Sequence, residues 1–112
     1  MTLQKINSFA AGEWVGPGSG ARPSESAVTG KVIAEAGNNA LDVQAMLDHA
    51  RNVGGPRLRA MTFHDRARML KALALKLGEQ KQKLYELSFS TGATQADNQI
   101  DIDGGIGTMF VF

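Results

Sequence analysis

The spacing of apolar residues changes at Leu41, and this change constrains the fold more than any other feature of the chain. Before it, short extended runs alternate with glycine-containing turns, as in small antiparallel sheets. After it, apolar residues recur at i, i+3, i+4 and i+7, the spacing of one helical face: Val43, Met46, Leu47 and Ala50. The sequence therefore predicts an α+β chain, with β-hairpins over residues 1–40 and three to four helices over residues 41–112.

Two hairpins are predicted in the first part. Residues 7–10 pair with 13–15 around Ala11-Gly12, and residues 24–28 pair with 31–36 around Thr29-Gly30. Glycine tolerates the positive φ that such tight turns require. Between the hairpins, residues 16–20 contain three glycines and a proline, which predicts a loop.

Glycine, proline and capping residues divide the helical part. Gly54-Gly55-Pro56 predicts the end of the first helix. Thr62 and Asp65 resemble a capping box and predict the start of the next helix. Its apolar face would consist of Phe63, Ala67, Leu70, Ala74 and Leu77. Gly78 permits a bend or break before a third helix over residues 79–90.

Two further predictions concern the helices that follow. Leu84 and Leu87 would anchor the third helix, and Gly92 would cap its carboxyl end. A last helix would begin between Asp97 and Asp101, because acidic side chains favour the positive end of a helix. Three glycines weaken this helix, at about 1 kcal/mol each relative to alanine. Close packing against another backbone would explain these glycines, which are Gly104, Gly105 and Gly107.

The final residues, Met109-Phe110-Val111-Phe112, are all large and apolar. Chain termini are usually polar and exposed, so this ending is typical of a truncated chain. We therefore expect residues 1–112 to be part of a larger domain. The alternative is a short natural chain whose last helix buries its tip in a partner.

Composition excludes several classes of partner and site. Twelve basic and eleven acidic residues give a net charge of +1, which offers no field for nucleic acid or an anionic membrane. The basic residues of the helices have ordinary amphipathic spacing and predict a solvated face. The chain has no cysteine, which excludes disulfides, thiolate metal sites and a cysteine nucleophile within it. No segment resembles a signal peptide or a membrane span, so we expect a cytoplasmic protein.

Two glycine-rich strings and one acidic string match known motifs only superficially. Residues 16–21 fit G-x-G-x-x-A, but Arg22-Pro23 prevents a helix from opening there. Residues 104–107 follow no convincing strand, and helix packing is the better interpretation. An EF-hand register through Asp101 would place Gln99 and Phe110 at the first and last ligand positions, where carboxylates are needed. We reject all three motifs.

The remaining candidate groups are two acidic residues and the two histidines. Asp97 and Asp101 are four residues apart and would hold a cation or a proton, or cap a helix; we favour capping. His49 and His64 each follow or precede an aspartate, but sequence neighbours point to different sides of a helix. Both histidines are expected at the surface or in caps. We assign no catalytic, cofactor-binding or metal-ligating residue.

Two strings and one helix carry a family resemblance. Residues 9–15, Phe-Ala-Ala-Gly-Glu-Trp-Val, follow the pattern F-I-x-G-E-W-V. Residues 27–34 follow N-P-x-T-G-x-x-I, with Ala27-Val28 near the place of Asn-Pro, and residues 63–77 follow R-x-x-x-L-x-x-x-A. These patterns resemble the amino-terminal region of the aldehyde dehydrogenase superfamily. The resemblance implies that residues 1–112 begin an α/β aldehyde dehydrogenase fold whose Rossmann sheet is missing.

Three further strings narrow the resemblance: residues 58–63, 91–97 and 101–108. They are similar to the bifunctional ring-opening proteins of aerobic phenylacetate degradation. That family joins an aldehyde dehydrogenase to an enoyl-CoA hydratase of the hotdog type. A related family, the dehydroadipyl-CoA semialdehyde dehydrogenases of benzoate degradation, lacks the hydratase. The resemblance implies a homo-oligomeric parent enzyme that oxidises an acyl-CoA semialdehyde with NADP.

The chemistry that this resemblance implies has no counterpart in these residues. In the family, a cysteine thiolate attacks the aldehyde, hydride passes to the nicotinamide, and water activated by a glutamate releases the acid. The chain has no cysteine, and no segment matches the family's asparagine motif. Asp101 aligns loosely with an acidic position near a monovalent-cation site in some relatives, and we do not assign it. Two hypotheses therefore stand: a segment of a dehydrogenase that is inactive alone, or a stand-alone interaction or scaffold protein.

Overall fold

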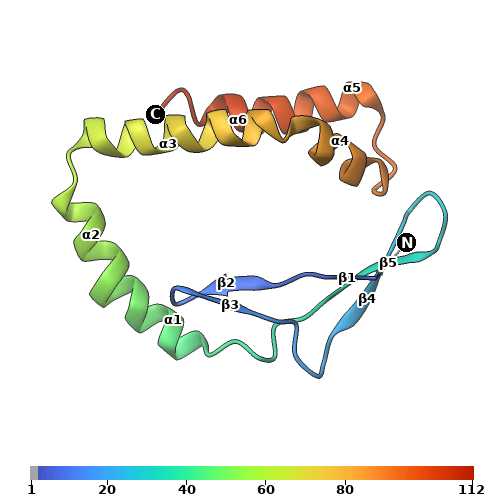
Figure 1. Ribbon diagram of the computed structural model, residues 1–112, viewed down its shortest axis with the longest axis horizontal. Helices are drawn as coiled ribbons and strands as arrows, with labels where there is room; N and C mark the ends of the chain where they lie inside the picture. The colour runs from blue at the N-terminus through green and yellow to red at the C-terminus, as the bar shows by residue number, and fades with distance from the viewer. Residues whose placement is uncertain (1–2) are drawn as a thin grey trace. The chain divides into compact units, whose positions relative to one another are not determined.

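The computed structural model describes residues 3–112, which form two units (Figure 1). The first unit ends at Ala60 and contains the strands and the first helical run, and the second is Met61–Phe112. Small sheets precede the helices, and the helices form four continuous runs within residues 3–112. This arrangement confirms the predicted α+β class.

A tight hairpin pairs strand β2 (Ser8–Ala10) with strand β3 (Glu13–Val15). The turn residues Ala11 and Gly12 both have positive φ, 51° and 86°, which matches the twist of a two-residue hairpin. Phe9 and Trp14 are directly opposite, and their rings meet edge to face with centroids 5.1 Å apart. The first predicted hairpin is therefore confirmed, although both aromatic side chains remain exposed.

The second sheet has three strands in the order β1-β5-β4. Strand β4 (Arg22–Glu25) pairs antiparallel with β5 (Val32–Ala36), which confirms the second predicted pairing with earlier bounds for its first strand. Pro23 is accepted because β4 is an edge strand, where a missing N–H need not break the ladder. The Ser26 hydroxyl accepts hydrogen bonds from the N–H groups of Val28 and Thr29, so the chain turns after Glu25 instead of extending to residue 28.

Strand β1 (Gln4–Lys5) lies parallel to β5 and was not predicted. It is only two residues long and both are polar, so no alternation of apolar and polar residues marks it. The pairing is extended by a hydrogen bond from Ile6 N to Glu35 O of 2.9 Å and by an ion pair between Lys5 and Glu35 at 3.7 Å. The strand therefore depends on contacts with residues about thirty positions away.

The first helical run continues through the sequence that was expected to end it. Helix α1 (Val43–His49) passes into a π-turn, η1 (Ala50–Gly54), and then into α2 (Gly55–Ala60). The prediction that Gly54-Gly55-Pro56 stops the helix is therefore wrong. In a regular α-turn the ring of Pro56 would clash with the carbonyl of Asn52. The wider π-turn precedes the proline, and its Gly55 N–H donates to Ala50 O, five residues back. The helix therefore continues through Pro56 into α2.

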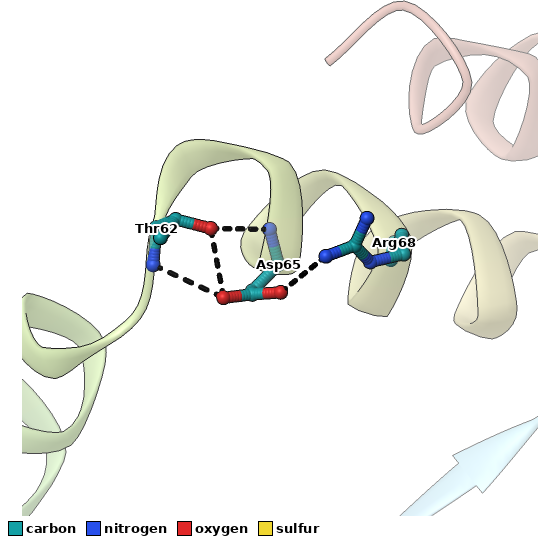
Figure 2. Close-up of polar contacts among 3 residues, drawn as sticks. All are labelled: Thr62, Asp65 and Arg68. Atoms are coloured by element: carbon teal, nitrogen blue, oxygen red, sulfur yellow. Dashed lines mark hydrogen bonds and ion pairs between the residues drawn. The ribbon is translucent and has the colours of Figure 1, made fainter.

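Helix α3 (Phe63–Glu79) begins at the predicted capping box (Figure 2). The Thr62 hydroxyl accepts from Asp65 N at 3.1 Å, and Thr62 N donates to the Asp65 carboxylate at 3.3 Å. Arg68 donates to the other carboxylate oxygen at 2.5 Å, one turn further along. These bonds satisfy free N–H groups at the helix start and complement its dipole, which explains why the helix begins here.

The apolar face of α3 is mostly as predicted. Ala74 is buried, and Ala67, Leu70 and Leu77 are half-buried, whereas Phe63 is 84% exposed. The helix ends at Glu79, and the break falls at Gln80, two residues after Gly78.

Helix α4 (Lys81–Phe89) follows, and its buried residue is not one of the two predicted leucines. Tyr85 is buried, Leu84 is half-buried and Leu87 is largely exposed, so the expectation for Leu87 is wrong. Gly92 takes a left-handed φ of 89° after the helix, and its N–H donates to Phe89 O, which confirms the predicted cap.

The last helical run is α5 (Gln95–Asn98), the π-turn η2 (Gln99–Asp103) and α6 (Gly104–Thr108). It begins at Gln95, earlier than predicted, because Thr94 and Asp97 form a second capping box. The carboxylate of Asp97 thus caps the helix from its third position, which supports capping over cation binding. A Cβ added at Gly104, Gly105 or Gly107 would meet nothing within 4 Å, so the expected close approach of another backbone is not made within residues 3–112.

The buried core within residues 3–112 is small. Its apolar members are Ala34, Ala74 and Tyr85, and its polar members are Ser26 and Asn98. Asn98 is fully buried, and neither its Oδ1 nor its Nδ2 has a hydrogen-bond partner in the described part of the chain. Many large apolar side chains stay exposed in both units, among them Trp14, Phe63 and Phe112.

Candidate functional site

Three polar side chains come together between α4 and the π-turn η2. Tyr85 Oη donates to Asp103 Oδ1 at 2.5 Å, and Lys81 Nζ donates to Asp103 Oδ2 at 3.1 Å. Lys81 also lies over the ring of Tyr85, 5.8 Å from its centroid. We call Lys81, Tyr85 and Asp103 the polar cluster. It joins residues that are about twenty positions apart in the sequence.

The hydrogen bonds of the polar cluster fix its protonation. The bond from Tyr85 lowers the pKa of the Asp103 carboxyl, and the bond from Lys81 lowers it further. The same carboxylate raises the pKa of Tyr85, and burial of the phenol raises it too. It also raises the pKa of Lys81. At neutral pH the cluster is therefore a carboxylate held by a neutral phenol and an ammonium.

Each Asp103 oxygen already accepts a bond, so the carboxylate is not placed as a free general base. A cavity of about 200 Å³ adjoins the cluster and is lined by Lys81, Asp103, Ile106 and Phe110, among others. No nucleophile faces it from the lining residues. The polar cluster therefore acts as a cross-link that fixes η2 against α4. Sequence reasoning did not predict the cluster, because it depends on a contact between residues about twenty positions apart.

The glycine loop over residues 16–20 is closed by an asparagine. With its amide oriented to satisfy both neighbours, Asn39 donates to Pro17 O at 2.9 Å and accepts from Gly20 N at 2.8 Å. The N–H that would face a phosphate in a nucleotide-binding loop is thus already bonded. The second glycine string lies inside a helix, where Gly104 N bonds to carbonyls of the preceding turn. Neither segment fits the dinucleotide of NADP.

The remaining candidates do not converge. His64 is exposed near the start of α3, His49 is half-buried at the end of α1, and Asp101 is exposed in η2. Across residues 3–112, no three histidine, aspartate or glutamate side chains gather where a metal ion would bind. The helices of the same residues are too short or too polar to cross a membrane.

Comparison with known proteins identifies the family of the chain. The family model described as "Aldehyde dehydrogenase family" matches residues 14–112. The chain belongs to this family. This member of the aldehyde dehydrogenase family is also similar to a 3,4-dehydroadipyl-CoA semialdehyde dehydrogenase from Aromatoleum evansii, with 34% identity over 107 residues. The resemblance drawn from the hairpin and helix strings is therefore confirmed at the level of the family.

The match covers 94% of this aldehyde dehydrogenase family chain but only 21% of the Aromatoleum protein. The chain thus spans about a fifth of the length of the curated relative that it matches. The catalytic cysteine expected of the family is absent from these 112 residues. Within residues 3–112, capping boxes begin α3 and the last helical run, and the polar cluster links α4 to η2.

Proposed function

We propose that this chain is the amino-terminal segment of an NADP-dependent aldehyde dehydrogenase that oxidises an acyl-CoA semialdehyde. The observation that carries the proposal is the 34% identity, across nearly the whole chain, to a protein named as a CoA-semialdehyde dehydrogenase. The family match over residues 14–112 supports the oxidoreductase class independently. We further propose that the parent is a cytoplasmic homo-oligomer.

The proposed reaction converts an aldehyde, water and NADP⁺ into a carboxylic acid, NADPH and a proton. Because the chain contains no cysteine, the attacking thiolate belongs to another part of the parent protein. Residues 3–112 contribute the capped helix α3 and the polar cluster, which stabilise the unit Met61–Phe112. A rigid scaffold keeps catalytic groups within the small tolerances that such chemistry needs.

Two pathways would supply such a substrate. We propose aerobic phenylacetate degradation, with the dehydrogenase fused to an enoyl-CoA hydratase-type ring-opening domain, on the resemblance of residues 58–63, 91–97 and 101–108. The alternative is a dehydrogenase for the dehydroadipyl-CoA semialdehyde of benzoate degradation. The name of the Aromatoleum relative favours this alternative. Both hypotheses predict an acyl-CoA semialdehyde as substrate.

Sequencing and expression test the proposal. The coding sequence after Phe112 should continue into a cysteine-containing dehydrogenase, and the longer protein should reduce NADP⁺ with an acyl-CoA semialdehyde. The 112-residue chain alone should show no turnover. A hydratase domain further downstream would support the phenylacetate pathway, and its absence the benzoate pathway. A stop codon directly after Phe112 with a folded, partner-binding chain would favour the scaffold hypothesis instead.

A further inference from the structure

The second unit carries a pocket whose one wall is basic. Three side chains on α3, His64, Arg68 and Lys71, recur at i, i+4 and i+7 and therefore share one helical face. They line a cavity of about 230 Å³, and no acidic side chain is part of its lining. Seven residues of helix span about 10 Å, so these groups can contact phosphate groups at more than one point.

Arg68 and Lys71 differ in how they are held. The Asp65 carboxylate binds one nitrogen of Arg68 at 2.5 Å from outside the lining, which orients the guanidinium and leaves its other N–H donors available. Within residues 3–112, Lys71 forms no ion pair, and it is exposed. The basic wall therefore has one oriented fork and one unpaired ammonium, both suited to phosphate.

The opposite wall is apolar and aromatic. It is formed by Met109, Phe110 and Phe112, with Ala67 beside them on α3. A second cavity of about 220 Å³ adjoins it, shares His64, Ala67 and Phe112, and adds the ring of Phe63. Aromatic side chains of this kind stack on the flat faces of nucleobases. We call the two cavities together the basic–aromatic pocket.

We propose that the basic–aromatic pocket binds the phosphorylated adenosine end of coenzyme A, with the adenine against the phenylalanine rings and the phosphates along His64, Arg68 and Lys71. This inference rests on the proposed acyl-CoA substrate and gives that substrate a binding site away from the reacting aldehyde. The charge of the basic wall complements the phosphates, and the apolar wall complements the base. A simple fatty carboxylate would use the apolar wall but only one of the basic groups.

Binding to the full 112-residue chain tests the proposal without any reaction. Coenzyme A is titrated into ¹⁵N-labelled chain at low salt, at a dilution where light scattering shows a monomer, and amide shifts are followed by NMR. We expect saturable shifts confined to residues 63–71 and 109–112, with a Kd of about 1 mM or tighter. Lys71→Gln should weaken binding about tenfold, because it removes one charge-assisted bond. Lys83→Gln is the matched control: it removes the same charge from exposed α4, outside the pocket, and should leave the Kd unchanged.

Three other probes distinguish coenzyme A from ligands that share its adenine, its phosphates or its apolar character. Dephospho-CoA should bind several-fold more weakly than coenzyme A, and octanoate more weakly still. NADP carries the same adenine and three phosphate groups, with its ribose phosphate at the 2′ position, so its affinity tests whether the pocket recognises the coenzyme A end in particular. Equal affinity for NADP or octanoate, equal effects of Lys71→Gln and Lys83→Gln, or no saturable shifts would each overturn the proposal. Aldehyde oxidation by the longer protein is measured separately, so a failure of coenzyme A binding here would leave the proposed dehydrogenase function standing.

Discussion

Replacing the buried Asn98 by alanine should stabilise the second unit, Met61–Phe112. Asn98 is fully buried at the junction of α5 and η2, and both polar atoms of its amide lack hydrogen-bond partners within residues 3–112. A buried amide without partners loses its bonds to water and gains nothing in return. Asn98→Ala removes that penalty and leaves the backbone unchanged.

The expected magnitude follows from three contributions. Removing an unsatisfied buried amide recovers about 1–3 kcal/mol. Alanine is a better helix former than asparagine by about 0.5 kcal/mol. The lost side-chain volume, roughly 25–30 Å³, costs about 0.7 kcal/mol as a small cavity. The free energy of unfolding should therefore rise by about 1–3 kcal/mol relative to the unaltered chain.

The single tyrosine of the chain provides the assay. Tyr85 is buried in the unit Met61–Phe112, so its emission reports the unfolding of that unit. Urea unfolding should show a higher midpoint for Asn98→Ala with an unchanged slope. Gln99→Ala, at the exposed next position, should change stability by less than about 0.5 kcal/mol. A lower midpoint for Asn98→Ala would refute the reasoning, because it would show that the amide is paired.

Five further outcomes are expected. Leu70→Ala should lower the free energy of unfolding in urea by about 2 kcal/mol, because Leu70 is half-buried on the apolar face of α3. Lys71→Ala should change it by less than about 0.5 kcal/mol. Equal effects would mean that the apolar face is misassigned. Thr62→Ala should cost about 1 kcal/mol by removing the cap, and Thr62→Ser should restore most of it; circular dichroism melting checks both. The pKa of Tyr85, read from phenolate absorbance, should lie above its ordinary value and fall in Asp103→Asn. Folding lowers the pKa of Asp103, so its contribution to stability should be lost as pH falls through that lowered pKa. Folding raises the pKa of Tyr85, so its contribution should be lost as pH rises through that raised pKa. A free energy of unfolding that does not change across both pH ranges would contradict this. Finally, the isolated chain should associate in size-exclusion chromatography with light scattering because of its exposed apolar side chains, and a monodisperse monomer would argue against this.

The parts of the fold that could be predicted from sequence are those determined by local chemistry. The turn at Ala11-Gly12 and the box of Thr62 and Asp65 lie within a few residues of each other, so their residue types identify them. The continuation of the first helix past Pro56 was not predictable in this way. It depends on a π-turn, which shifts hydrogen bonds by one residue without a distinctive sequence pattern.

The candidate site was less predictable than the fold. Tyr85 lies beside Leu84 and Leu87 in an apolar pattern that favours the leucines, and Asp103 lies in a string that indicates a family resemblance but no contact with Tyr85. Their pairing requires α4 and η2 to lie against each other, which is a tertiary contact. Family membership, by contrast, could be inferred from short strings, because a hairpin such as residues 9–15 combines several specific residue types at fixed spacing.

The π-turn η2 also determines which side chains of the last helical run share a face. Five residues separate Asn98 from Asp103, and in an uninterrupted α-helix they would point about 140° apart. The extra residue in the π-turn reduces this to about 40°, so that Asn98 is buried while Asp103 reaches Tyr85 on α4. A relative with one residue fewer between these positions would have a regular helix there, and the relative orientation of these two side chains around the helix axis would change. Single-residue gaps in alignments of the family should therefore be placed within residues 99–103, and they should coincide with replacement of the Tyr85 and Asp103 pair.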